Sequence, residues 1–140
     1  MSDINAKTPL LVLSVIQVLV GIALGIMVGR IIERYDSTDT KHDINVTRSI
    51  RGLISLTSIM IVGGLTMIMT MSQTDKINPG ILLKISLIIP LLEAISLIVL
   101  GAIIEAKEPE ISGDENKALL GIGAGWAVIS SIIIYVILIK

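Results

Sequence analysis

Long runs of hydrophobic residues alternate with short polar segments along this chain. Four runs have few polar interruptions, and they cover about residues 9–32, 52–71, 81–104 and 118–139. An α-helix rises about 1.5 Å per residue, so about 20 residues cross the roughly 30 Å of hydrocarbon in a bilayer. Each run reaches that length, and none shows the short alternating pattern of a membrane β-strand. The pattern therefore predicts four transmembrane helices.

The polar segments between the runs are short. Residues 33–51 and 105–117 carry mixed charge and are expected to be loops, and residues 72–80 contain Asn-Pro-Gly, which is typical of a turn. The first run lacks a cleavage signal, so we expect it to be retained. We therefore predict an all-α, polytopic membrane protein, with one four-helix transmembrane domain over residues 1–140 and both termini on one side.

Composition agrees with this class and excludes several functions. The chain is 53% hydrophobic and its mean hydropathy is +0.90, values that are rare in a soluble domain of this length. A net charge of −1 gives no reason to expect a nucleic-acid partner. The chain has no cysteine, and its single histidine, His42, lies in a polar segment, so we expect no metal site and no other cofactor.

Enzyme motifs are also missing from the sequence. There is no H-E-x-x-H, no G-x-S-x-G, no pair of aspartates within the hydrophobic runs, and no histidine within them. The sequence therefore predicts a protein that is not an enzyme.

The sequence leaves the sidedness of the protein open. Most lysines and arginines fall in or beside the first and third connecting segments, which favours a cytosolic position for these segments. Asn45 begins the sequence Asn-Val-Thr, a glycosylation motif that would place the first segment on the opposite side. The membrane, plasma or intracellular, also stays open.

Glycines recur at helical spacing within the runs. Small residues let membrane helices approach closely and gain dispersion contacts. Packing within one bundle is one explanation, and a homo-oligomer interface is the other. Three glycines on one face of the first run exceed the need of one neighbour, so we also expect a homo-oligomer. The glycines concerned are Gly21, Gly25, Gly29, Gly63, Gly64, Gly121 and Gly125.

One acid, Glu93, lies near the middle of the third run. A charged side chain at this depth costs about 2.5 kcal/mol or more, so it marks a site on a proton or cation path by default. Gln17 and Ser130 lie at a similar depth in their own runs, which permits a shared polar cluster. The structural alternative is a neutral Glu93, hydrogen-bonded to Gln17 or a serine, that serves packing only.

Three segments resemble the membrane-spanning four-domain subfamily A, the tetraspan family of the B-lymphocyte antigen and the IgE receptor β chain. They are "LSVIQVLVGIALG" from Leu13, "IVGGLT" from Ile61, and "LLKISL" from Leu82. The chain departs from the family at Pro90, Glu93 and Ala94, and it lacks the family's loop cysteines. The positions matching single motif residues are Leu13, Gln17, Val18, Gly21, Gly25, Lys84, Ser86 and Leu87.

This resemblance implies cytosolic termini and oligomers that act as signalling partners, chemosensors or cation channels. A second resemblance is to the proteolipids of rotary ATPases, whose carboxylate helix is similar to "PLLEAISLIVLGAII" and whose glycine helix is similar to "GIALGIMVG".

Two functional hypotheses follow. The first is a non-enzymatic tetraspan protein that acts as an oligomeric scaffold or as a signalling or receptor-associated subunit. The second is a small cation or proton channel or transporter, including a proteolipid-like role, that uses Glu93 with Gln17 and Ser130. Either would have the lipid bilayer, other copies of itself and other membrane proteins as partners.

Overall fold

The computed structural model describes residues 7–38, 41–73 and 81–139 of the chain. The turn predicted at Asn78-Pro79-Gly80 lies outside the described residues, and so do the side chains of Lys84 and Ser86.

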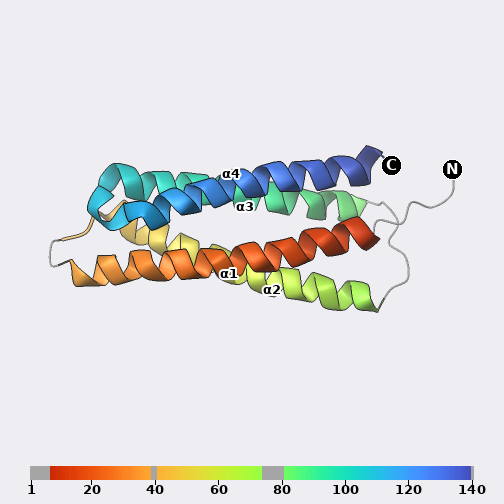
Figure 1. Cartoon of the computed structure of the whole chain (residues 1–140), viewed down its shortest axis with the longest axis horizontal. Helices are drawn as coiled ribbons and strands as arrows, with labels where there is room; N and C mark the ends of the chain where they lie inside the picture. The colour runs from red at the N-terminus through yellow and green to blue at the C-terminus, as the bar shows by residue number, and fades with distance from the viewer. Residues whose placement is uncertain (1–6, 39–40, 74–80, 140) are drawn as a thin grey trace.

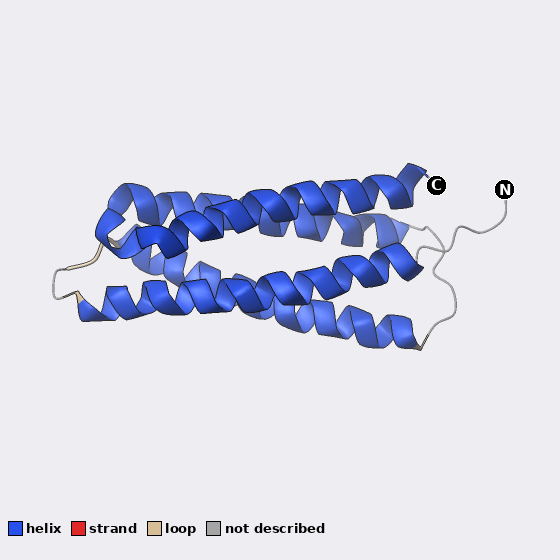
Figure 2. Ribbon diagram, in the orientation of Figure 1, coloured by secondary structure: helices blue, strands red, loops and turns tan. Residues whose placement is uncertain are grey.

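Four helices form an antiparallel bundle (Figure 1). They are α1 (Lys7–Ser37), α2 (Ile44–Ser72), α3 (Ile81–Lys107) and α4 (Pro109–Ile139). Each helix packs against the one that follows it, and α4 closes the ring against α1. Figure 2 shows the helices joined by short loops, and α1 begins at the end of the bundle where α4 ends. The prediction of an all-α four-helix bundle is confirmed.

All four helices contain a segment long and apolar enough to cross a bilayer. Many large hydrophobic side chains on their outer faces are exposed, among them Leu19, Val62 and Leu92. Such a surface is stable in lipid, where exposed apolar side chains cost nothing. The protein is thus an integral, multi-pass membrane protein.

The helices extend well beyond the hydrophobic runs at one end of the bundle. The expectation of loops over residues 33–51 and 105–117 is wrong for most of both segments, because α1 continues to Ser37, α2 starts at Ile44 and α4 starts at Pro109. A helix of 31 residues is about 46 Å long, which exceeds the roughly 30 Å of hydrocarbon. The hydropathy pattern marks only the part of each helix that meets lipid.

Glycines set the close approach of α1 to α2. A Cβ atom at Gly64 would lie 2.6 Å from Val18 Cγ2 and 3.0 Å from the Ser14 carbonyl oxygen. A Cβ at Gly21 would lie 2.8 Å from Ile61 Cγ1. Any larger residue at these positions would force the two helices apart.

The other glycines singled out from the sequence have looser surroundings. A Cβ added at Gly25 would lie 3.4 Å from Thr57 Cγ2, and one added at Gly63 would lie 3.5 Å from Gln17 Nε2. No atom of the described residues lies within 4 Å of a Cβ added at Gly29, Gly121 or Gly125.

The close contact of α4 with α3 is made by a different glycine, Gly123. A Cβ there would lie 3.2 Å from Leu97 Cβ and 3.5 Å from the Ala94 carbonyl oxygen.

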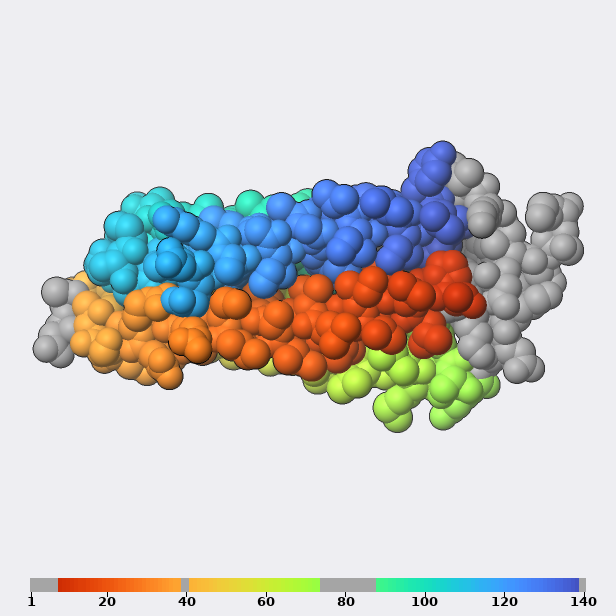
Figure 3. Space-filling view, viewed as in Figure 1, coloured from red at the N-terminus to blue at the C-terminus, as the bar shows by residue number. Residues whose placement is uncertain are grey.

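Along the face shown in Figure 3, α4 packs against α1.

Candidate functional site

Glu93 lies on the inner face of α3, where only 4% of its surface is exposed. The same face buries Pro90, Ala94 and Leu97, while Leu92 and Ile95 face outward. Neither carboxyl oxygen of Glu93 has a hydrogen-bond partner among the described residues. Buried polar groups are nearly always hydrogen-bonded, so this carboxyl needs an explanation other than packing.

Glu93 lines a cavity of about 190 Å³ that lies between α1, α2 and α3. Gln17 lines the same cavity, so the structure brings together two of the three polar residues that the sequence suggested. The remaining lining is mainly apolar: Leu10, Leu13, Ser14, Ile59, Gly63, Met67, Ile89 and Pro90.

Ser130 is fully buried but does not line this cavity. Its hydroxyl donates a hydrogen bond to the carbonyl of Trp126, four residues earlier on α4. Serine in a membrane helix commonly satisfies its hydroxyl in this way, and the sequence gives no sign of it. Equal depth in the membrane therefore did not bring Ser130 to the acid.

Hydrogen-bond donors around the cavity are mostly engaged already. Gln17 Nε2 donates to the Met60 carbonyl at 3.0 Å, and the Ser14 hydroxyl donates to the Leu10 carbonyl at 2.9 Å. These bonds leave Gln17 Oε1 and the lone pairs of the Ser14 oxygen for a ligand, beside the two oxygens of Glu93. The cavity therefore presents mainly acceptors.

Trp126 completes the surroundings of the acid, and the sequence analysis missed it. Its side chain is 1% exposed, and its indole N–H lies beside the Glu93 carboxyl without reaching hydrogen-bond geometry. Tryptophan in membrane helices normally lies at the lipid–water interface. A lone tryptophan well inside the fourth run was the available signal.

The cavity lies in the half of the bundle where the chain begins and ends. Figure 1 shows α2 diverging from α3 toward that end. In the other half the core is closed by fully buried side chains, including Leu24, Leu53 and Ile104. Among the described residues, the site therefore has no continuous path to the far end.

A polar network closes that far end. His42 Nδ1 lies 2.7 Å from Glu108 Oε1, His42 Nε2 lies 2.9 Å from the Tyr35 carbonyl oxygen, and the Asp43 N–H donates to Glu108 Oε2 at 3.0 Å. The His42 ring also stacks on Tyr35 at a centroid distance of 3.7 Å. The hydrogen bond to Glu108 is the main cause that raises the pKa of His42 above 6.5.

Arg34 joins the network from α1. Its guanidinium donates to the carbonyls of Ile111 and Ser112 at 2.8 and 3.1 Å, and it forms an ion pair with Glu115. These contacts bind the start of α4 to α1, which fixes the loop end of the bundle.

Asn45, the candidate glycosylation residue, lies in the first turn of α2 and is exposed. The Thr47 hydroxyl of the same motif is 2.7 Å from the Tyr35 hydroxyl. Glycosylation at Asn45 stays a prediction.

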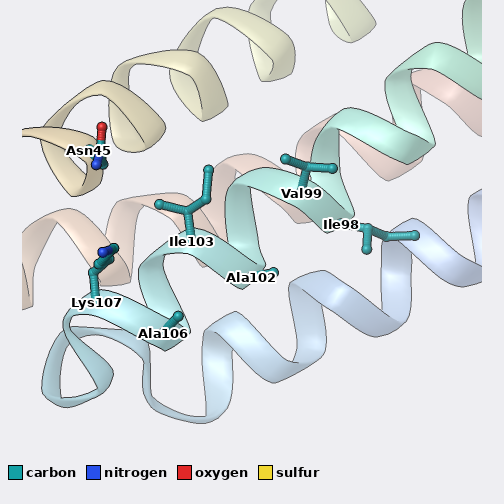
Figure 4. Close-up of a pocket in the computed structure, with 7 residues that line it drawn as sticks. All are labelled: Asn45, Ile98, Val99, Ala102, Ile103, Ala106 and Lys107. Carbon is teal, nitrogen blue, oxygen red and sulfur yellow. The ribbon is translucent and has the colours of Figure 1, made fainter.

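A second, larger hollow of about 610 Å³ lies along α3 beside the start of α2 (Figure 4). Its lining is apolar apart from Asn45 and Lys107 at one end, and it consists otherwise of Ile98, Val99, Ala102, Ile103 and Ala106. None of these residues carries a buried unpaired polar atom. This hollow is a lipid-facing groove, and the Glu93 cavity is the candidate site.

No group of three or more His, Cys, Asp or Glu residues that could hold a metal ion occurs within residues 7–38, 41–73 and 81–139. Comparisons of the chain with protein-family models, curated proteins and solved structures find no match. The resemblance to the four-domain subfamily A therefore stays a prediction, and function has to be argued from the cavity.

Proposed function

We propose that this protein binds a proton or a small cation at Glu93 and carries it across the membrane. The observation that supports this is the Glu93 carboxyl, 4% exposed and without a hydrogen-bond partner among the described residues, at the wall of a cavity. Acidic residues inside a membrane bundle mark proton and ion pathways. Of the two hypotheses from the sequence, this geometry favours transport.

The chemistry of the site explains how binding would work. A protonated Glu93 is neutral and can remain in an apolar core, whereas an ionised Glu93 needs a cation beside it. Proton and cation would therefore compete for one carboxyl. Leu24 and Leu53 close the cavity toward the loop end. A change of conformation must therefore open this closed end for an ion to cross. This feature favours a transporter over an open channel.

The test is cation and proton flux into liposomes that contain the purified protein. We expect flux from the wild type and a loss of at least tenfold in Glu93→Gln, which keeps the size of the side chain but cannot ionise. Glu110→Gln is the matched control, because Glu110 is an exposed acid outside the cavity. Wild-type flux that survives in Glu93→Gln would contradict the proposal.

A second candidate function is an oligomeric scaffold or a signalling or receptor-associated subunit. It is favoured by Gly29, Gly121 and Gly125, where an added Cβ meets no atom of the described residues within 4 Å, so that another helix can approach. The family resemblance also implies such a role. A well-folded wild type that gives no flux of protons or cations would leave this function as the better explanation.

A further inference from the structure

The hydrogen-bonding groups around Glu93 restrict the chemistry of what the cavity can bind. Most of the free atoms are acceptors: both Glu93 oxygens, Gln17 Oε1 and the Ser14 oxygen. Free donors are also present, namely the second N–H of Gln17 Nε2 and the indole N–H of Trp126. A ligand that fits them donates several hydrogen bonds and carries positive charge. An ammonium group has three N–H donors and no acceptor, which matches this set.

The rest of the cavity is apolar. Leu13, Ile59, Met67 and Ile89 are among the lining residues, and no second charged side chain occurs among the described residues of the lining. The volume of about 190 Å³ equals that of roughly six water molecules at about 30 Å³ each. This space suits an ammonium head with a short hydrocarbon body of about four carbons.

A bare metal cation fits the same site poorly. Calcium takes six to eight oxygen ligands and magnesium keeps a nearly octahedral shell, whereas the cavity offers one carboxylate and two neutral oxygens. Apolar walls also replace the water that such an ion would retain. The single negative charge of Glu93 is balanced by a ligand with one positive charge. The apolar walls of the cavity favour a ligand whose remaining part is apolar.

We propose that the Glu93 cavity binds a small amphiphilic organic monocation, a primary or secondary alkylammonium, in preference to inorganic cations. This inference rests on the proposed cation site at Glu93, and it adds the class of ligand. The ammonium would donate to Glu93 and Gln17, and its alkyl chain would lie against Leu13, Ile59 and Met67.

The protein carries its own probe for this binding. Trp126 is the only tryptophan in the chain and lies beside Glu93. Its fluorescence in detergent micelles is measured while n-butylammonium, tetramethylammonium, potassium or sodium is added. We expect a saturable change with n-butylammonium at a concentration at least tenfold lower than for the other three. Tetramethylammonium has the charge but no N–H donor, so it separates hydrogen bonding from charge.

Two variants and one control test the placement of the ligand, with Glu110→Gln as the control. Glu93→Gln should lose the n-butylammonium response, and Glu110→Gln should keep it. Met67→Ala retains the acid and enlarges the apolar part of the cavity. It should therefore move the preferred alkyl chain of the ligand from butyl toward hexyl. An equal response to potassium and n-butylammonium, or an unchanged response in Glu93→Gln, would overturn the inference.

Failure of the ligand class and failure of transport are distinguishable. Flux of protons or potassium that depends on Glu93, with no preference for n-butylammonium, refutes the ligand class and leaves the proposed function. Tight n-butylammonium binding without any flux supports the ligand class and refutes the transport step.

Discussion

Two buried acidic residues of this bundle differ in their hydrogen-bond partners. Glu108 is 6% exposed and accepts from the Asp43 N–H and pairs with His42. Glu93 is 4% exposed and has no partner among the described residues. A buried charge with well-placed partners is explained by the fold itself. The acid without partners is the one that has room for a ligand.

His42 gives the fold a pH dependence that can be measured. Both ring nitrogens face acceptors, so the doubly protonated ring satisfies both contacts. The hydrogen bond to Glu108 raises the pKa of His42 above 6.5 in the folded protein. Protonated His42 therefore stabilises the folded protein. This contribution is complete below pH 6.5 and is lost as the pH rises through the higher folded-state pKa of His42. We expect the unfolding temperature to fall over that interval.

Thermal unfolding in detergent at a series of pH values checks this. His42→Gln and Glu108→Gln should both reduce the decrease of the unfolding temperature with rising pH, since each removes one partner of the His42–Glu108 pair. A wild type whose unfolding temperature is constant across that interval, or a His42→Gln variant with an unchanged fall, would contradict the assignment.

Among the elements, α4 is the one whose helix is interrupted. Gly113 has φ 58° and ψ −169°, a conformation essentially restricted to glycine. The guanidinium of Arg34 packs over it, at 2.8 Å from where a Cβ would be. This break turns the first residues of α4 back across the bundle end, and Arg34 then binds the carbonyls of Ile111 and Ser112.

Gly113→Ala should therefore destabilise the protein by about 1–3 kcal/mol, the usual cost of forcing a side chain into that region. Thermal or denaturant unfolding in detergent measures the loss. The matched control is Gly121→Ala in the helical part of the same element, where an added Cβ meets nothing within 4 Å. That variant should be neutral or gain about 0.5–1 kcal/mol from helix propensity. Equal effects of the two substitutions would refute a special role for Gly113.

The sequence predicted the number of helices but misjudged where they end. Hydropathy reports contact with lipid, whereas the ends depend on polar contacts such as the Asp43 cap on the Asn45 N–H and the bonds of Arg34. Pairs far apart in sequence, such as His42 with Glu108, leave no local pattern.

The candidate site was predictable to a similar extent. Glu93 and Gln17 stood out because polar residues are rare in membrane helices, and the structure places both at one cavity. Ser130, Trp126 and Gly123 could not be assigned in advance, because rotation of α4 about its axis decides which side chains face α3. Depth along the membrane can be counted from the sequence, and this rotation cannot.

At the scale of the whole molecule, the two halves of the bundle have different characters. The loop end is closed by buried side chains and by the network of Arg34, His42 and Glu108. The opposite half contains the cavity, and there α2 diverges from α3 (Figure 1). A transport cycle would therefore have to open the packed core between the cavity and the loop end, unless another copy of the chain supplies the missing half of the path.

The open glycines of α4 provide the test of whether copies associate. Gly121 and Gly125 are four residues apart, so they share one helix face, and no atom lies within 4 Å of a Cβ added at either. If this face packs against a second copy, Gly121→Leu blocks the approach of the two backbones and releases monomers. We expect the mass in mild detergent, measured by light scattering, to drop to that of one chain while the unfolding temperature of the bundle is kept. Val62→Leu enlarges an exposed side chain of α2, away from this face of α4, and should leave the mass unchanged. An oligomer that survives Gly121→Leu would show that these glycines face lipid and that copies associate through another face. A monomeric wild type would show that one chain must hold the entire path from Glu93.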